Sequence, residues 1–271
     1  MNLLENILLI WLPRLEVSSI TINQATTKTI NNMKSLWRIA LCLFSFLNIL
    51  PATVSATHLM GGNLTYTYNG LNASTGQYEY TVTLKIYRYC ATGSSQLPNS
   101  LALGIYQDNV SNPNGNKVIV GTSQIQLVSQ QAIVPPNANA SCTFTPSVCV
   151  EEGTYQTTIS VPLNTSGYYL IADRCCRNGN IANLDNPGGA GQTYFAYIPP
   201  ANIVNNSPTF AVPPVPFICT GDTVSVLNQA NDIDGDSLAY SFEIPYNGIA
   251  NSGNPSPGSP ASYPWPIQTI T

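Results

Sequence analysis

Strict alternation of side chains over a dozen residues constrains the fold of this chain more than any other feature. The stretch Tyr78–Cys90 reads YEYTVTLKIYRYC, with an apolar or aromatic residue at every second position from Tyr78 to Ile86. A period of two is typical of a β-strand with one buried face and does not fit a helix. The preceding NLTYTY places Leu64, Tyr66 and Tyr68 on one face, and the turn-rich YNGLNASTGQ lies between the two stretches. We expect a β-hairpin here.

Further stretches carry the same strand signature, and none after residue 56 shows a helical period. They are residues 117–120, 123–128, 155–161, 168–173 and 193–198. We therefore expect an all-β protein in which residues 57–205 form an antiparallel β-sandwich domain.

A proline-rich stretch marks the predicted domain boundary. NNSPTFAVPPVPFIC, residues 205–219, contains four prolines. Beyond it, the alternating LAYSFEIP indicates another strand, and a tail rich in Pro, Gly and Ser follows. Residues 206–271 are too few for a whole sandwich of roughly 100 residues. We expect them to be the truncated start of a second Ig-like or cadherin-like β domain.

The N-terminal region has the pattern of a signal peptide that starts at Met33. Lys34 and Arg38 precede a twelve-residue apolar run, and Val-Ser-Ala ends at Ala56. We predict that residues 33–56 are the signal peptide, cleaved between Ala56 and Thr57, and that residues 1–32 are an upstream translation artefact. The alternative is a membrane anchor starting at Met1, for which the apolar run is short.

Charge excludes two classes of partner for the mature chain, residues 57–271. It keeps five Lys and Arg against eleven Asp and Glu, a net charge of −6. A chain so acidic and so poor in lysine lacks the basic surface that nucleic acid or an anionic lipid requires. It also has no apolar run long enough to span a membrane. We expect a secreted, extracellular or outer-membrane surface location.

Six cysteines remain after cleavage, an even number that favours disulfides in an exported chain. We predict that all six are oxidised and that Cys142 and Cys149 close a local loop. Cys90, at a strand end, is expected to meet Cys175 or Cys176, although a vicinal Cys175–Cys176 bridge is the alternative. Zinc is disfavoured because no Cys-x2-Cys spacing occurs. The six residues are Cys90, Cys142, Cys149, Cys175, Cys176 and Cys219.

Three aspartates at alternate positions, Asp232, Asp234 and Asp236, precede the strand signature LAYSFEIP. Carboxylate oxygens at alternate residues of a turn are typical calcium ligands. An EF-hand is excluded, because Ser237 stands where that loop needs glycine and the following residues alternate like a strand. The sequence leaves two interpretations open, a calcium site and a solvated Asp-Gly turn.

The sequence gives no support for catalysis. A serine or cysteine nucleophile needs a base, and His58 is the sole histidine. Glu151 and Glu152 are adjacent, so on a strand they would point to opposite faces and are expected to be surface charges rather than a glycosidase pair. The many tyrosines fit sheet packing better than sugar stacking, since they follow the strand period.

Five motifs in order resemble the N-terminal region of large gliding-motility-associated bacterial surface proteins. They are HLMGGNLTY after the signal peptide, LKIYRYC, YYLIADRCCRN, NNSPTF and DIDGDSLAY, and they span Thr57 to about Gly248. The resemblance implies type IX secretion, a longer parent with Ig-like, PKD-like or cadherin-like repeats, and a C-terminal sorting domain. No sorting domain occurs before Thr271, which leaves either a fragment or another route of secretion. The resemblance supplies no catalytic residues.

These observations together predict a non-enzymatic binding module, part of an adhesin for surface attachment or gliding, with a polysaccharide or protein ligand. Two alternatives remain from other classes. One is an accessory carbohydrate-binding region of a secreted polysaccharide-degrading enzyme, and the other is a passive structural stalk. Loops at the ends of a rigid sandwich are where such scaffolds carry binding residues.

Overall fold

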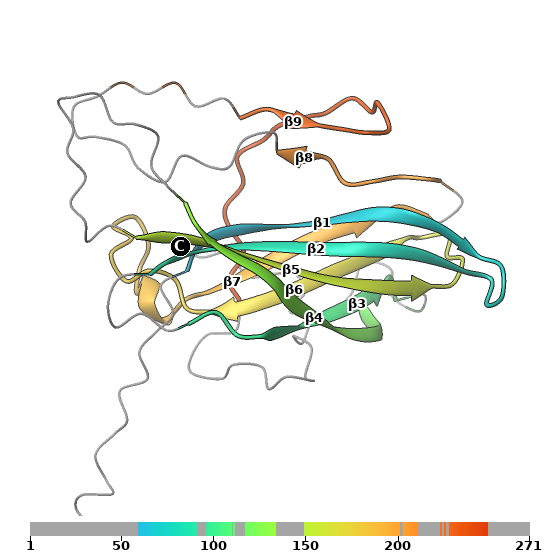
Figure 1. Ribbon diagram of the computed structural model, residues 1–271, viewed down its shortest axis with the longest axis horizontal. Coiled ribbons are helices and arrows are strands. Elements are labelled where there is room, and N and C mark those ends of the chain that lie inside the picture. The colour runs from blue at the N-terminus through green and yellow to red at the C-terminus, as the bar shows by residue number, and fades with distance from the viewer. Residues whose placement is uncertain are drawn as a thin grey trace, which may run out of the picture. The chain divides into compact units, whose positions relative to one another are not determined.

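Nearly all regular structure in the described part of the chain is β-strand (Figure 1). The computed structural model describes residues 59–90, 96–109, 111, 117–133, 149–200, 203–210, 223, 225 and 228–248. The elements are β1 (Leu59–Asn72), β2 (Gln77–Tyr89), β3 (Ser100–Gln107), β4 (Val118–Ala132), β5 (Val150–Val161), β6 (Tyr168–Cys175), the 3-10 turn η1 (Pro187–Gly189), β7 (Gly191–Ile198), β8 (Thr209–Phe210) and β9 (Ala230–Asn231).

Seven strands join in a single antiparallel sheet in the order β1-β2-β5-β4-β3-β6-β7. This confirms the all-β prediction. The division into two packed sheets, which a sandwich requires, stays unconfirmed because β1–β7 are hydrogen-bonded in one sheet. Six antiparallel pairings separate the two edge strands, so β1 and β7 run in the same direction. Strands β8 and β9 form a separate two-stranded pair.

The predicted hairpin is β1–β2, but its turn lies later than the Asn-Gly dipeptide suggests. The turn is closed by Asn72, whose side-chain oxygen accepts the N–H groups of Ser74 and Thr75 at 2.9 and 3.2 Å. Gly76 completes it with φ +67°, a value that favours glycine. Gly70 instead lies at a register shift within β1, with φ +127°. The Asn-Gly signal therefore marks a β-bulge and not the hairpin turn.

One apolar core receives side chains from all seven strands of the sheet. In β2, residues at every second position are buried, as the alternation predicts. Buried side chains of the other six strands contact those of β2 in one cluster, which requires the sheet to curl around this cluster. The largest fully buried side chains include Tyr80, Tyr155, Tyr168, Leu59, Leu84, Ile86, Leu103, Ile125, Leu170 and Ile198.

Two strand predictions need correction. β3 was not anticipated, because LALGIY has a buried residue at almost every position rather than at alternate ones. LAYSFEIP, in contrast, forms no strand in the described structure: Tyr240, Phe242 and Ile244 are 54%, 104% and 60% exposed. Its alternation has no partner strand there to bury it.

The N-terminal predictions lie outside the described residues. These are the segment 1–32, the signal peptide 33–56 and the cleavage site Ala56–Thr57. The boundary between 205 and 206 also stays a prediction. Within the described ranges, no helix has the length and apolar character that crossing a membrane requires.

Candidate functional site

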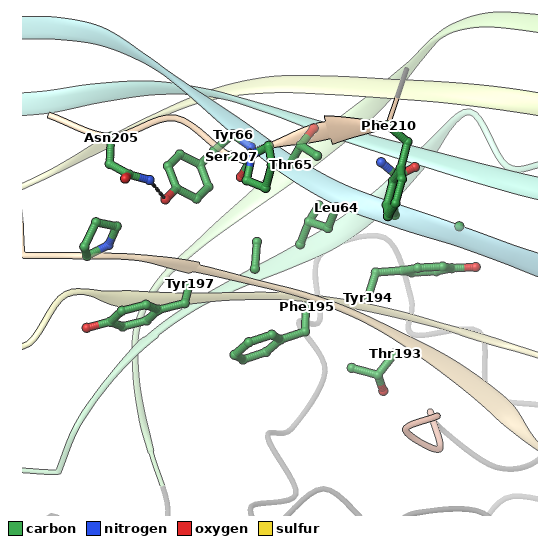
Figure 2. Close-up of a pocket in the computed structure, with 15 residues that line it drawn as sticks. Leu64, Thr65, Tyr66, Thr193, Tyr194, Phe195, Tyr197, Asn205, Ser207 and Phe210 are labelled. Carbon is green, nitrogen blue, oxygen red and sulfur yellow. Dashed lines mark hydrogen bonds between the residues drawn. The ribbon is translucent and has the colours of Figure 1, made fainter. Parts of the chain in front are cut away.

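A groove of about 680 Å³ lies between the two edge strands of the sheet, β1 and β7 (Figure 2). Leu64, Thr65 and Tyr66 come from β1, and Thr193 to Tyr197 face them from β7. The segment after β7 closes one end. The full lining is Gly62, Asn63, Leu64, Thr65, Tyr66, Thr193, Tyr194, Phe195, Ala196, Tyr197, Pro199, Asn205, Ser207, Pro208 and Phe210.

The groove narrows beside Gly62, where a Cβ would come within 2.5 Å of the Tyr194 ring. Only glycine allows β1 and the Tyr194 ring to approach this closely. Leu64, Tyr66, Tyr194 and Ala196 are buried members of the core, so the floor of the groove is the apolar interior of the sheet.

One stretch of the β1 edge is covered by the segment that follows β7. Tyr66 N–H donates to Ser207 Oγ at 3.0 Å, and Ser207 N–H donates to the Tyr66 carbonyl at 2.9 Å. Tyr68 N–H donates to Asn206 Oδ1 at 2.8 Å. Because Asn206 lies beside Tyr68 and Ser207 beside Tyr66, the segment runs antiparallel to β1.

Tyr66 also holds this segment through its side chain. Asn205 Nδ2 donates to the phenol oxygen of Tyr66 at 2.7 Å, as Figure 2 shows. Burial raises the pKa of Tyr66 to about 12, and the nearby Asp234 and Asp232 add to the rise, whereas the Asn205 hydrogen bond opposes it. Tyr66 therefore stays a neutral phenol through the physiological pH range.

The β7 edge is covered at its start. Gly191 N–H donates to Asn247 Oδ1 at 3.0 Å, and Thr193 Oγ1 donates to the Asn247 carbonyl at 2.8 Å. Arg177 joins the same place, with its Nε on the Gly191 carbonyl at 2.8 Å and a terminal nitrogen on the Tyr246 carbonyl at 2.9 Å. Residues that follow β7 in the sequence thus bond to both edges of the groove, Asn206 and Ser207 to β1 and Asn247 to β7.

An aromatic row lies along the β7 side of the groove; we define it as Tyr169, Phe195, Tyr197 and Tyr246. The Tyr169 ring lies 4.9 Å from Tyr197 and 6.0 Å from Phe195, and Phe195 lies 6.4 Å from Tyr246. Lys117 places its ammonium 4.4 Å from the Tyr169 ring centre and pairs with Asp108. Tyr197 is 40% exposed. The tyrosines were predicted as sheet partners, and their alignment in a row across β6 and β7 was missed.

The three aspartates form a tight loop. Asp232 Oδ1 accepts the N–H groups of Asp234 and Asp236 at 2.9 and 3.3 Å, which folds the turn. Asp234 uses both oxygens on Asn206, accepting its main-chain N–H at 2.6 Å and its side-chain amide at 2.8 Å. One carboxylate oxygen from each aspartate lies within 4.8 Å of the others.

These oxygens are the ligand type that calcium takes, so the donor set fits the ion. Each carboxylate oxygen that accepts one hydrogen bond keeps a second lone pair. Calcium binding by Asp232, Asp234 and Asp236 therefore stays a prediction. The alternative interpretation is a turn that its own hydrogen bonds hold without an ion.

The disulfide pairing differs from the prediction. Cys90 is bonded to Cys149, not to Cys175 or Cys176, and the proposed Cys142–Cys149 bridge is therefore wrong. The cause is register: β2 ends at Tyr89 opposite Val150 at the start of β5, which brings the next residues together. Cys175 and Cys176 form the vicinal bridge that was the alternative. Cys142 and Cys219 lie outside the described residues.

The adjacent glutamates have structural partners. Glu151 pairs with Arg88 at 2.6 Å and accepts from Gln130. Glu152 is only 4% exposed and pairs with Lys85 at 3.3 Å, so its expected surface position is wrong. The groove itself presents main-chain groups, hydroxyls, one carboxamide and aromatic rings, a chemistry suited to binding.

No protein-family model, curated protein or solved structure matches the chain.

Proposed function

We propose that this chain is an exported, non-enzymatic binding module of a cell-surface adhesin, and that its ligand is a polysaccharide. The observation that carries the proposal is the aromatic row beside the groove. Sugars present apolar C–H faces that stack on aromatic rings, and their hydroxyls need polar groups close by. Asp108 and Lys117 adjoin Tyr169 within the row, and the Thr193 hydroxyl bonds the carbonyl of Asn247, the residue after Tyr246.

The rigidity of the platform supports the same function. Tyr169 and Tyr197 are directly opposite on two paired strands, and the Tyr197 hydroxyl donates to the Ser166 carbonyl at 2.8 Å. Rings held this way lose little conformational entropy when a ligand binds. The signal-peptide pattern of the sequence adds the expectation of export, where surface polysaccharides are found.

The proposal is tested by affinity electrophoresis, which measures binding of the exported protein to a panel of neutral and acidic polysaccharides. We expect Tyr197→Ala to weaken retention by about tenfold, since loss of one exposed stacking ring costs about 1.4 kcal/mol. Tyr197→Phe keeps the ring and should retain most of the affinity. Val128→Ala, which removes an exposed apolar side chain of β4 outside both the row and the groove, should leave binding unchanged.

Two results contradict the proposal. Failure to bind any polysaccharide leaves the passive stalk as the explanation. Turnover of a polysaccharide that a single carboxylate substitution abolishes would place the chain with the enzymes.

A further inference from the structure

The basic residues after residue 56 decide which charge a ligand of this chain can carry. There are five of them, and all five lie in the part of the chain that the structure describes. A polysaccharide with carboxylate or sulfate groups gives up hydration when it binds, so its anions need charged donors in return. The five candidates for that role are Lys85, Arg88, Lys117, Arg174 and Arg177.

Two of the five lie on β2 and are paired with the adjacent glutamates of β5. Arg88 is buried, and its Nε donates to Glu151 Oε2 at 2.9 Å. Lys85 Nζ lies 3.3 Å from Glu152 Oε1. The side chain of Lys85 is 41% exposed, but the carboxylate of Glu152 balances its charge. Neither residue offers an unbalanced positive charge to a ligand.

The two arginines beside the vicinal disulfide are enclosed by the fold. Arg174 and Arg177 are both buried. Arg177 donates to the main-chain carbonyls of Gly191 and Tyr246 at 2.8 and 2.9 Å, so its guanidinium is part of the framework. A polymer chain that lies on the outside of the sheet therefore meets neither guanidinium.

Lys117 is the basic residue that contacts a ring of the aromatic row. Its ammonium lies 4.4 Å from the centre of the Tyr169 ring and pairs with Asp108. The side chain of Lys117 is only 9% exposed, whereas that of Asp108 is 28% exposed. A ligand at this place meets the carboxylate before the ammonium, so an anionic ligand faces repulsion. A sugar hydroxyl can instead donate to a free lone pair of the carboxylate.

The other polar groups near this part of the row are uncharged. Asn164 Nδ2 donates at 3.0 Å to Oε1 of Gln107, which directly precedes Asp108 in the sequence. The Tyr197 hydroxyl donates to the carbonyl of Ser166, two residues after Asn164. Amides and hydroxyls both donate and accept hydrogen bonds, as the hydroxyls of a sugar do.

The charge of the whole mature chain acts in the same direction. Residues 57–271 carry eleven Asp and Glu against five Lys and Arg, a net charge of −6. A surplus of negative charge repels a polyanion at long range and slows its encounter with the protein.

We infer that the polysaccharide is an uncharged one, recognised by ring stacking and by hydrogen bonds to its hydroxyls rather than by ion pairs. The inference rests on the proposed function, because it names the chemical class of ligand for the same aromatic row. Asp108 has two roles in this recognition. It accepts hydrogen bonds from the sugar, and it neutralises Lys117, which would otherwise attract an anion.

Matched pairs of polysaccharides with one backbone and different charge test the inference by affinity electrophoresis. The pairs are hydroxyethyl and carboxymethyl cellulose, methyl-esterified and de-esterified pectin, and agarose and a sulfated galactan. The exported chain is run at pH 8 in EDTA, so that histidine is uncharged and calcium is absent. In any pair that binds, we expect the neutral member to bind about tenfold or more tightly than the charged one. Added salt should leave binding of the neutral member unchanged.

Asp108→Asn tests the role of the Lys117–Asp108 pair. It leaves Lys117 without its counter-charge, so affinity for the charged member should rise about two- to fivefold, the range expected of one partly exposed ion pair. Glu79→Gln is the matched control, because it changes the net charge equally and keeps an oxygen for Asn72 to donate to. Glu79 lies on β2, outside the row and the groove. An Asp108→Asn variant that binds the charged member no better than Glu79→Gln contradicts the role of the pair.

Three further results overturn the inference, and they separate it from the proposed function. A charged member that binds as tightly as its neutral counterpart overturns the inference and leaves polysaccharide binding in place. A charged member that binds only after calcium replaces EDTA does the same, in favour of recognition through a bound cation. Failure of every polysaccharide to bind removes the proposed function, and the inference with it.

Discussion

Asn206 connects β1 and the aspartate loop, which lie far apart in the sequence. Its side-chain oxygen accepts Tyr68 N–H, while its amide nitrogen donates to Asp234. We expect Asn206→Ala to lower the free energy of unfolding by about 1–3 kcal/mol, because two partners lose a hydrogen bond and one of them is charged. Denaturant unfolding measures this. Asn183→Ala, at an exposed position, is the control, and an equal effect of both variants would contradict the role of Asn206.

Calcium binding at the aspartate loop is a second prediction at the scale of residues. Asp232, Asp234 and Asp236 hold like charges close together, and a cation relieves their repulsion. We expect calcium near the millimolar affinity of extracellular modules to raise the melting temperature. Asp236→Asn should abolish the shift and Asp185→Asn, an exposed carboxylate elsewhere, should preserve it. An unchanged melting temperature of the unsubstituted protein identifies the loop as a plain turn.

At the scale of elements, the Cys90–Cys149 disulfide ties the end of β2 to the residue before β5. It closes a loop with a sequence separation of 59, so its removal increases the entropy of the unfolded chain. We expect replacement of both cysteines by alanine to cost about 2–4 kcal/mol of stability. Denaturant unfolding of the double variant tests this.

Peptide mapping without reduction tests the pairing itself. It should recover a linked fragment that contains Cys90 and Cys149. A fragment linking Cys149 to Cys142 would restore the interpretation drawn from the sequence.

The elements also show what alternation in a sequence can predict. In β2 it identified the buried face correctly, because neighbours on both sides of that strand leave one face inward. It missed β3, where nearly every residue is buried. It predicted a strand at Leu238–Ile244, where the residues have the pattern but pair with no strand among the described residues. Alternation indicates that successive side chains face two different environments. A strand also needs hydrogen-bond partners, and distant segments of the chain supply them.

The candidate site was less predictable than the strands. Asp234 was selected as a cation ligand, yet its contact with Asn206 joins two motifs, NNSP and DxDGD, that the sequence shows only as separate. The groove depends on which strands are the edges, and that follows from the strand order. The wrong pairing of Cys149 has the same origin, because sequence proximity to Cys142 outweighed an unknown register.

At the scale of the whole molecule, buried tyrosines make stability sensitive to alkaline pH. Burial raises the pKa of Tyr80 to about 12 and that of Tyr87 to about 12 from an ordinary value of 10. Their contribution is complete below pH 10, where both states keep the proton. Above pH 10 the unfolded chain releases protons that the folded chain retains, so stability falls as pH rises towards 12.

Denaturant unfolding at pH 8 to 12 measures this loss. Tyr80→Phe removes one such group, so the variant should lose less stability over that range than the unsubstituted protein. An identical pH dependence of the two proteins would contradict the role of Tyr80.

The junction around Arg177 has a mechanical consequence. Leu59 N–H donates to the Cys176 carbonyl and the Leu59 carbonyl accepts from Asn178, while Arg177 holds the carbonyls of Gly191 and Tyr246. Leu59 and Tyr246 are therefore only one short segment apart. A tensile load applied through Leu59 and Gly248 would cross this junction directly, and the strands of the sheet would carry little of it. Such a load would break the contacts of Arg177 before it separated the strands of the sheet.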